Sequence, residues 1–144
     1  MFDKTVDERL SAWAQHRVSL ENGDDPLTEV WEFWQQAPYI PYNRNIDPFN
    51  QRSWPTPWEI IVHNKYDDFT KALMMAWSLK YTERFKDERI EIKTLVNDHK
   101  TCYYNIVCVD NNWVLNYNDN GPVDVKNLPN TFLLENLIEV KTPR

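Results

Sequence analysis

The chain contains little of what several common classes of protein depend on. Two glycines among 144 residues leave no glycine-rich loop of the kind that binds nucleotide phosphates. No run of lysine or arginine occurs, and the net charge is −6 with a pI near 5.0. Nucleic-acid binding needs clustered cations that displace counterions. The sequence therefore predicts neither a nucleotide site nor a nucleic-acid partner.

Long apolar segments are also missing. No stretch approaches the roughly 18 apolar residues that a membrane-spanning helix requires. Residues 1–20 are charged and helical in pattern, without the apolar region of a signal peptide. We therefore expect a soluble protein that is not exported by a signal peptide and has no membrane partner. It would lie in the cytoplasm or in a virus particle that assembles in the host cytoplasm.

Only two cysteines and three histidines are present. Cys102 and Cys108 would lie roughly 20 Å apart on one strand, too far for a disulfide, so we expect both to be free, buried thiols. His16, His63 and His99 have none of the spacings typical of metal ligands. We expect neither a metal nor a cofactor.

Aromatic residues and proline are, by contrast, abundant: seven Trp, seven Tyr and nine Pro. We expect most Trp side chains inside and the excess at a protein–protein surface. The proline-rich, aromatic segment 38–57 resists both helix and central strand, so it predicts an extended loop that packs on its own domain or on a partner. The candidates for interface anchors are Trp31, Trp34, Tyr39, Tyr42, Phe49 and Trp54.

Four helix starts are recognisable from capping residues. The first helix carries an apolar stripe up to residue 20, the second ends at Pro38, the third is short, and the fourth has an apolar surface broad enough to be buried against a sheet. The starting residues are Thr5 with Glu8, Asp25 before Pro26, Thr56 before Pro57 with Glu59, and Asp67 or Asp68.

Alternating and apolar segments in the second half of the chain predict strands over 89–96, 101–109, 113–117, 132–134 and 137–140. Together with the helices they predict an α+β fold with one domain over residues 1–144. Residues 1–37 would form a helical N-terminal part and residues 38–57 the loop. Residues 58–144 would form a core in which a buried central helix packs on a small antiparallel sheet.

Three segments of this core resemble a known family. They are Tyr66-Asp67-Asp68-Phe69 with Ala72, Tyr103-Tyr104-Asn105-Ile106-Val107, and Val114-Leu115-Asn116-Tyr117. Their order resembles transglutaminase-like proteins with a papain-like core, in particular the bacterial transglutaminase-like cysteine proteinases. The resemblance implies a nucleophilic cysteine at the start of the buried helix, a histidine on the next hairpin and an aspartate after an apolar strand. The corresponding positions here are Asp68, Tyr104 and Asn116.

None of these three residues supplies a thiolate or a base that titrates near neutral pH, so we expect no acyl-transfer activity. The sequence then favours a noncatalytic structural or adaptor protein that contacts other proteins, and copies of itself, in an assembly. Its composition resembles phage tail, baseplate or neck proteins. Two alternatives remain: a regulatory protein that binds a soluble host or viral enzyme, and a cysteine hydrolase that uses Asp98, His99 and Cys102.

Overall fold

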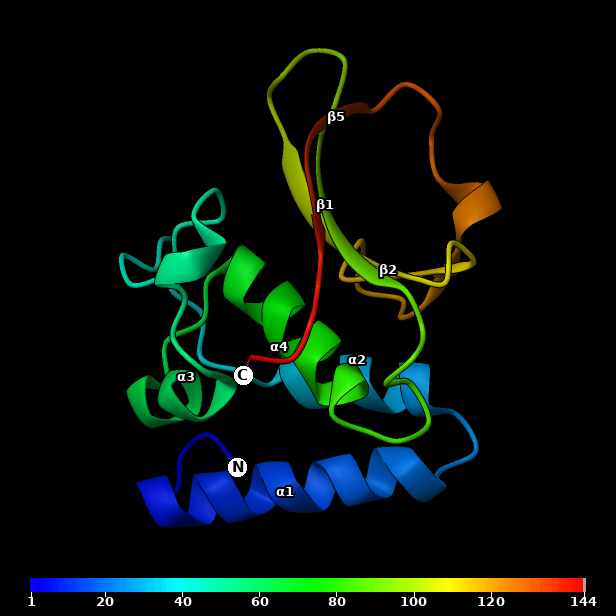
Figure 1. The fold of residues 1–144 in the computed structure, drawn as a ribbon. Coiled ribbons are helices and arrows are strands. Elements are labelled where there is room, and N and C mark those ends of the chain that lie inside the picture. The colour runs from blue at the N-terminus through cyan, green and yellow to red at the C-terminus, as the bar shows by residue number, and fades with distance from the viewer. Residues whose placement is uncertain (144) are drawn as a thin grey trace.

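The computed structural model describes residues 1–143 and has the α+β fold that the sequence predicts. Helices gather on one side of the molecule, and the sheet rises from them (Figure 1). Between the second and third helices, residues 38–56 contain only one short 3-10 turn, Gln51–Ser53. The helices are α1 (Val6–Asn22), α2 (Pro26–Gln35), α3 (Pro57–His63) and α4 (Asp68–Lys80).

All four helices begin where the capping residues predict. The Thr5 hydroxyl accepts a hydrogen bond from the backbone N–H of Glu8, and Asp25 caps α2 in the same way through Thr28. Thr56 and Glu59 cap α3 reciprocally, each accepting a bond from the other's backbone N–H. Local side-chain chemistry thus fixes where these helices start.

The sheet is antiparallel, with the strand order β4-β3-β2-β1-β5. The last strand is continuous, although the sequence predicts two pieces, because a bulge opposite Thr94 and Leu95 absorbs the break in its pattern. Strand β3 ends two residues earlier than expected because Asn116 adopts a left-handed backbone (φ 66°). The strands are β1 (Ile90–Val96), β2 (Tyr103–Val109), β3 (Trp113–Leu115), β4 (Val123–Asp124) and β5 (Leu133–Glu139).

Helix α4 is the centre of the larger hydrophobic core. Every residue from Phe69 to Leu79 except Lys71 is buried. The helix packs against β1 and β2 and also against α1 and α2. The Ser78 hydroxyl accepts hydrogen bonds from the indole N–H groups of Trp13 (2.9 Å) and Trp34 (3.0 Å), which are both fully buried. The Ser78 hydroxyl therefore satisfies the hydrogen-bond donors of two buried indole rings in the middle of the core.

A smaller hydrophobic cluster covers the other face of the sheet. Leu95, Ile106, Cys108 and Val114 form its buried part. Tyr104, Tyr117 and Phe132 pack over it, with Tyr104 lying 5.4 Å from Tyr117 and 5.2 Å from Phe132 between ring centroids. Strand alternation separates this cluster from the α4 side, because successive side chains point to opposite faces.

The two cysteines differ in their surroundings. Both are free, and Cys108 is buried in β2, where burial raises the pKa of its thiol. Cys102 is exposed, so the expectation that it would be buried is wrong. It precedes the first residue of β2 and belongs to the hairpin loop, where no sheet face covers it.

No helix formed by residues 1–143 combines the length and the apolar character needed to cross a bilayer.

Candidate functional site

Asp68, Asn105 and Asn116 meet in one polar cluster between the start of α4 and the sheet. Asp68 Oδ2 accepts hydrogen bonds from Asn105 through its side-chain amide (2.9 Å) and its backbone N–H (3.2 Å). Asp68 Oδ1 accepts one from Asn116 Nδ2 (3.1 Å), which also donates to the backbone carbonyl of Asn105 (2.9 Å). The carboxylate therefore ties α4 to β2 and to the segment after β3.

Two local features hold this cluster in place. Asp68 lies in the first turn of α4, where the helix dipole favours a negative charge. Asn116 occupies the left-handed region, which asparagine tolerates better than most residues, and its turn brings the amide back toward α4. Thr94 on β1 donates a hydrogen bond to Asn105 Oδ1 (2.8 Å) and fixes the orientation of that amide.

Tyr104 does not join this cluster, and Asn105, the next residue, lies beside Asp68 and Asn116 instead. The reason is the two-residue period of the strand, which turns Asn105 toward α4 and Tyr104 toward the smaller cluster. The signal was present in the sequence, because Ile106 and Cys108 lie on the Tyr104 face and belong to that cluster. Of the three positions that the resemblance singles out, the structure therefore brings Asp68 and Asn116 together and leaves Tyr104 on the other face of the sheet.

The cluster makes structural contacts between α4, β2 and the segment after β3. Acyl transfer requires a nucleophile activated by a base, and an amide is neither. The Asp68 carboxylate is occupied by three hydrogen-bond donors and has no histidine beside it to orient. The most direct effect of the cluster is to fix the position of α4 relative to the sheet.

The six aromatic interface candidates divide into buried and exposed residues. Trp34 is fully buried and is therefore corrected from a surface anchor to a core residue. Trp31 and Trp54 are half-buried and pack against the larger core. Tyr39, Tyr42 and Phe49 are 64%, 67% and 75% exposed. The apolar periodicity of α2 could not show whether Trp34 is a surface anchor or a core residue, because both kinds of residue recur at the same helical spacing.

The loop that carries the exposed rings is attached to its own domain. Asn43 is buried, and its backbone N–H donates to Asp67 Oδ2 (3.0 Å) while its side chain donates to the Lys65 carbonyl (3.1 Å). Ile46 is buried in the core, and the Trp54 indole N–H donates to the Asp47 carbonyl. Of the two packing alternatives, the structure shows the loop on its own domain, with three aromatic rings directed outward.

A groove of about 370 Å³ opens beside this loop. Its lining contains two cations, Arg44 and Lys65, and no carboxylate. The sequence did not predict that these two residues line one groove, because they are separated by about twenty positions and neither belongs to a basic run. The lining residues are Ile40, Tyr42, Asn43, Arg44, Asn45 and Lys65.

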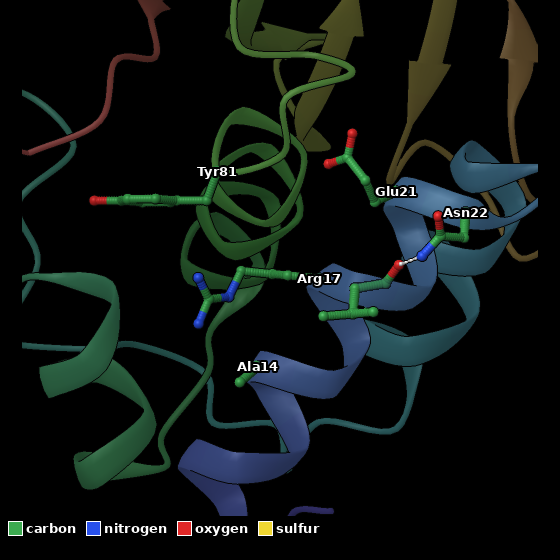
Figure 2. A pocket seen from close by; sticks show the side chains of 6 residues that line it. Ala14, Arg17, Glu21, Asn22 and Tyr81 are labelled. Atoms are coloured by element: carbon green, nitrogen blue, oxygen red, sulfur yellow. Dashed lines mark hydrogen bonds between the residues drawn. The ribbon is translucent and has the colours of Figure 1, made fainter.

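A second groove lies between α1 and the end of α4 (Figure 2). Arg17 extends across it, with its guanidinium carbon 4.2 Å from the centroid of the Trp13 ring, and burial lowers the pKa of this arginine. Glu21 lines the same groove, but its oxygens accept the backbone N–H groups of Glu83 and Arg84. The Arg17–Trp13 contact lies within α1 and explains the arginine as a packing residue, while the Glu21 contacts join α1 to the turn that follows α4.

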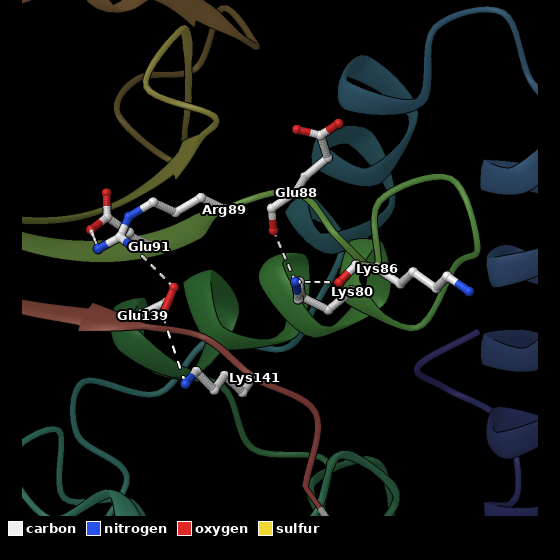
Figure 3. A network of polar contacts seen from close by, with 7 residues as sticks. All are labelled: Lys80, Lys86, Glu88, Arg89, Glu91, Glu139 and Lys141. Carbon is white, nitrogen blue, oxygen red and sulfur yellow. Dashed lines mark hydrogen bonds and ion pairs between the residues drawn. The ribbon is translucent and has the colours of Figure 1, made fainter.

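The charged residues at the start of β1 form a network that is also structural (Figure 3). Arg89 bridges Glu91 (3.0 Å) and Glu139 (3.1 Å), and the hydrogen bond that its guanidinium donates to the Glu91 carboxylate raises the pKa of the guanidinium. Lys80 donates to the carbonyls of Lys86 and Glu88. These contacts hold together the start of β1, the end of β5 and the end of α4.

The residues of the alternative hydrolase site are all on the hairpin between β1 and β2. The side chains of His99 and Asp98 are 81% and 60% exposed, with Nε2 and Oδ1 3.7 Å apart. Cys102 is exposed as well. These side chains lie in solvent, where nothing positions a substrate or excludes water. Among residues 1–143, no three His, Cys, Asp or Glu side chains are grouped so as to hold a metal ion.

No protein-family model matches the chain, and no curated protein matches it at a significant level.

Proposed function

We propose that the protein is a noncatalytic structural or adaptor protein that contacts other proteins in a larger assembly. The observation that carries the proposal is the cluster of Asp68, Asn105 and Asn116. The transglutaminase-like resemblance assigns the nucleophile to the Asp68 position and the orienting acid to the Asn116 position. Asn105 lies one residue from the position assigned to the base. A carboxylate and two amides in these places support a scaffold used for binding.

A phage particle is the assembly that we favour, as a tail, baseplate or neck component. The support is the composition, which combines net negative charge, many asparagines and an excess of aromatic residues. The location would then be the virion, or the host cytoplasm during assembly. The exposed rings of Tyr39, Tyr42 and Phe49 supply contact area on a loop that is already ordered.

The test is to purify the tagged protein from its native source, identify the proteins that come with it and determine its mass by light scattering. We expect virion proteins in a stoichiometric complex. Two results would count against the proposal: a monomer without any partner, or a complex with a soluble enzyme, which would favour the regulatory alternative. Hydrolysis of a peptide substrate that is lost in a Cys102→Ser variant would establish the hydrolase instead.

A further inference from the structure

The groove beside the loop carries positive charge on a protein that is negative as a whole. Arg44 and Lys65 both line it and are both exposed. In the described range, 1–143, neither forms an ion pair; the Lys and Arg side chains that do are Lys86, Arg89 and Lys141. The net charge of the chain is −6, so an uncompensated pair of cations in one groove is a local reversal of sign.

The rest of the groove suits a polypeptide chain. Tyr42 offers a large ring that is two-thirds exposed, and Ile40 adds apolar surface. The side-chain amide of Asn45 is exposed and can donate to and accept from a peptide group. Tyrosine and arginine are both enriched among the residues that contribute most energy at protein–protein contacts.

The groove is also formed before any partner arrives. Asn43 is held by Asp67, by the Lys65 carbonyl and by Thr70 Oγ1 (3.4 Å), and its own Oδ1 accepts the backbone N–H of Asn45 (3.0 Å). The backbone N–H of Ile40 donates to the Tyr66 carbonyl (3.0 Å). Binding here would cost little conformational entropy, because the loop is already ordered.

We propose that this groove binds an acidic segment of a partner protein, with carboxylates of the segment paired to Arg44 and Lys65 and its apolar side chains on Tyr42. The inference rests on the proposed adaptor function and names the chemistry of the partner. Charge complementarity favours an acidic partner, because a basic or neutral segment would leave both cations unpaired.

The test measures the fluorescence anisotropy of a labelled peptide built from glutamate, serine and leucine, with a matched peptide that has lysine in place of each glutamate. We expect the acidic peptide to bind at least about tenfold tighter and to weaken as salt is raised. The variant Arg44→Glu/Lys65→Glu should lose this binding. Lys4→Glu/Lys126→Glu, which makes the same charge change at exposed lysines elsewhere, should keep it within about twofold.

Equal affinity for the two peptides, or an equal loss in both double variants, would overturn the proposal. Failure of the adaptor function would look different. If the groove does not bind the acidic peptide while the protein still copurifies with an assembly, only the identity of the partner segment is wrong. If the protein has no partner at all, the adaptor function itself fails.

Discussion

The interior around α4 and the loop over residues 38–57 use polar groups in opposite ways. In the interior, Ser78 satisfies two indoles and Asp68 satisfies two asparagines, so their hydrogen-bonding capacity is consumed within the fold. On the loop surface, Arg44 and Lys65 remain without carboxylates, and Tyr42 remains exposed.

This difference separates stability from binding. A paired buried group contributes to stability and has nothing left to offer a ligand, while an unpaired exposed group contributes little to stability and is available. Replacements in the interior should therefore lower the free energy of unfolding, and replacements on the loop should change association alone.

Among the replacements of polar residues, the largest effect is expected for Ser78→Ala. It removes the acceptor of two buried indole N–H groups, from Trp13 and Trp34, and should lower the free energy of unfolding by about 2–5 kcal/mol. Urea denaturation measures the change. Ser11→Ala, on the exposed side of α1, should stay within about 0.5 kcal/mol. A loss below about 1 kcal/mol in Ser78→Ala would mean that the indoles find other acceptors.

A pH-dependent loss of stability is expected from His16. Its ring stacks on Phe33 with centroids 3.8 Å apart, and burial lowers its pKa to about 4. Between pH 6.5 and 4 the unfolded chain binds a proton that the folded chain does not. The free energy of unfolding should therefore fall as pH is lowered through this range, by up to roughly 3 kcal/mol.

Denaturation curves at several pH values check this contribution. The carboxylates of Glu29 and Glu32 line the same surface as His16, so the informative quantity is the difference between variants. His16→Phe keeps an aromatic ring and should flatten the decline, while His63→Gln, at an exposed position, should leave it unchanged. Identical profiles for the two variants would remove His16 as the cause.

An intermediate effect is expected for Asp68→Ala. The change leaves the amides of Asn105 and Asn116 without their acceptor in a half-buried site, which should cost about 1–3 kcal/mol of unfolding free energy. Asp98→Ala, on the exposed hairpin, is the matched control and should be nearly neutral. If Asp68→Ala proves as stable as the control, the cluster does not lock α4 to the sheet.

The smallest effect on stability is expected for Tyr42→Ala and Phe49→Ala. Both rings are mostly exposed, so each change should stay within about 0.5 kcal/mol in thermal denaturation. Trp34→Ala, which removes a fully buried ring, should cost about 3–5 kcal/mol. Destabilisation by Tyr42→Ala comparable to that of Trp34→Ala would place the tyrosine in the core and end its use as an anchor.

Much of the fold follows from local sequence. Thr5, Asp25, Thr56 and Asp67 cap helices that start as predicted, because a capping side chain bonds to a backbone only three residues away. The short strand β4 was not predicted, since two residues carry no alternation and pairing with β3 alone defines it. The bulge in β5 depends likewise on its neighbour β1.

The candidate site was less accessible to prediction. Asp68 and Asn116 were identified, but Asn105 was missed by one residue because the strand register decides which face a side chain joins. Arg44 and Lys65 line one groove because hydrogen bonds of Asn43 and of the Ile40 N–H bind the loop to the segment before α4. No sequence pattern encodes that contact.

The most direct test of the account is a titration of the ¹⁵N-labelled protein with the acidic peptide, followed by two-dimensional NMR. The account predicts chemical-shift changes confined to residues 39–49 and Lys65, with the side-chain amides of Asn105 and Asn116 unmoved. Shifts centred on those two amides, with the loop unchanged, would contradict it and would assign binding to the interior cluster.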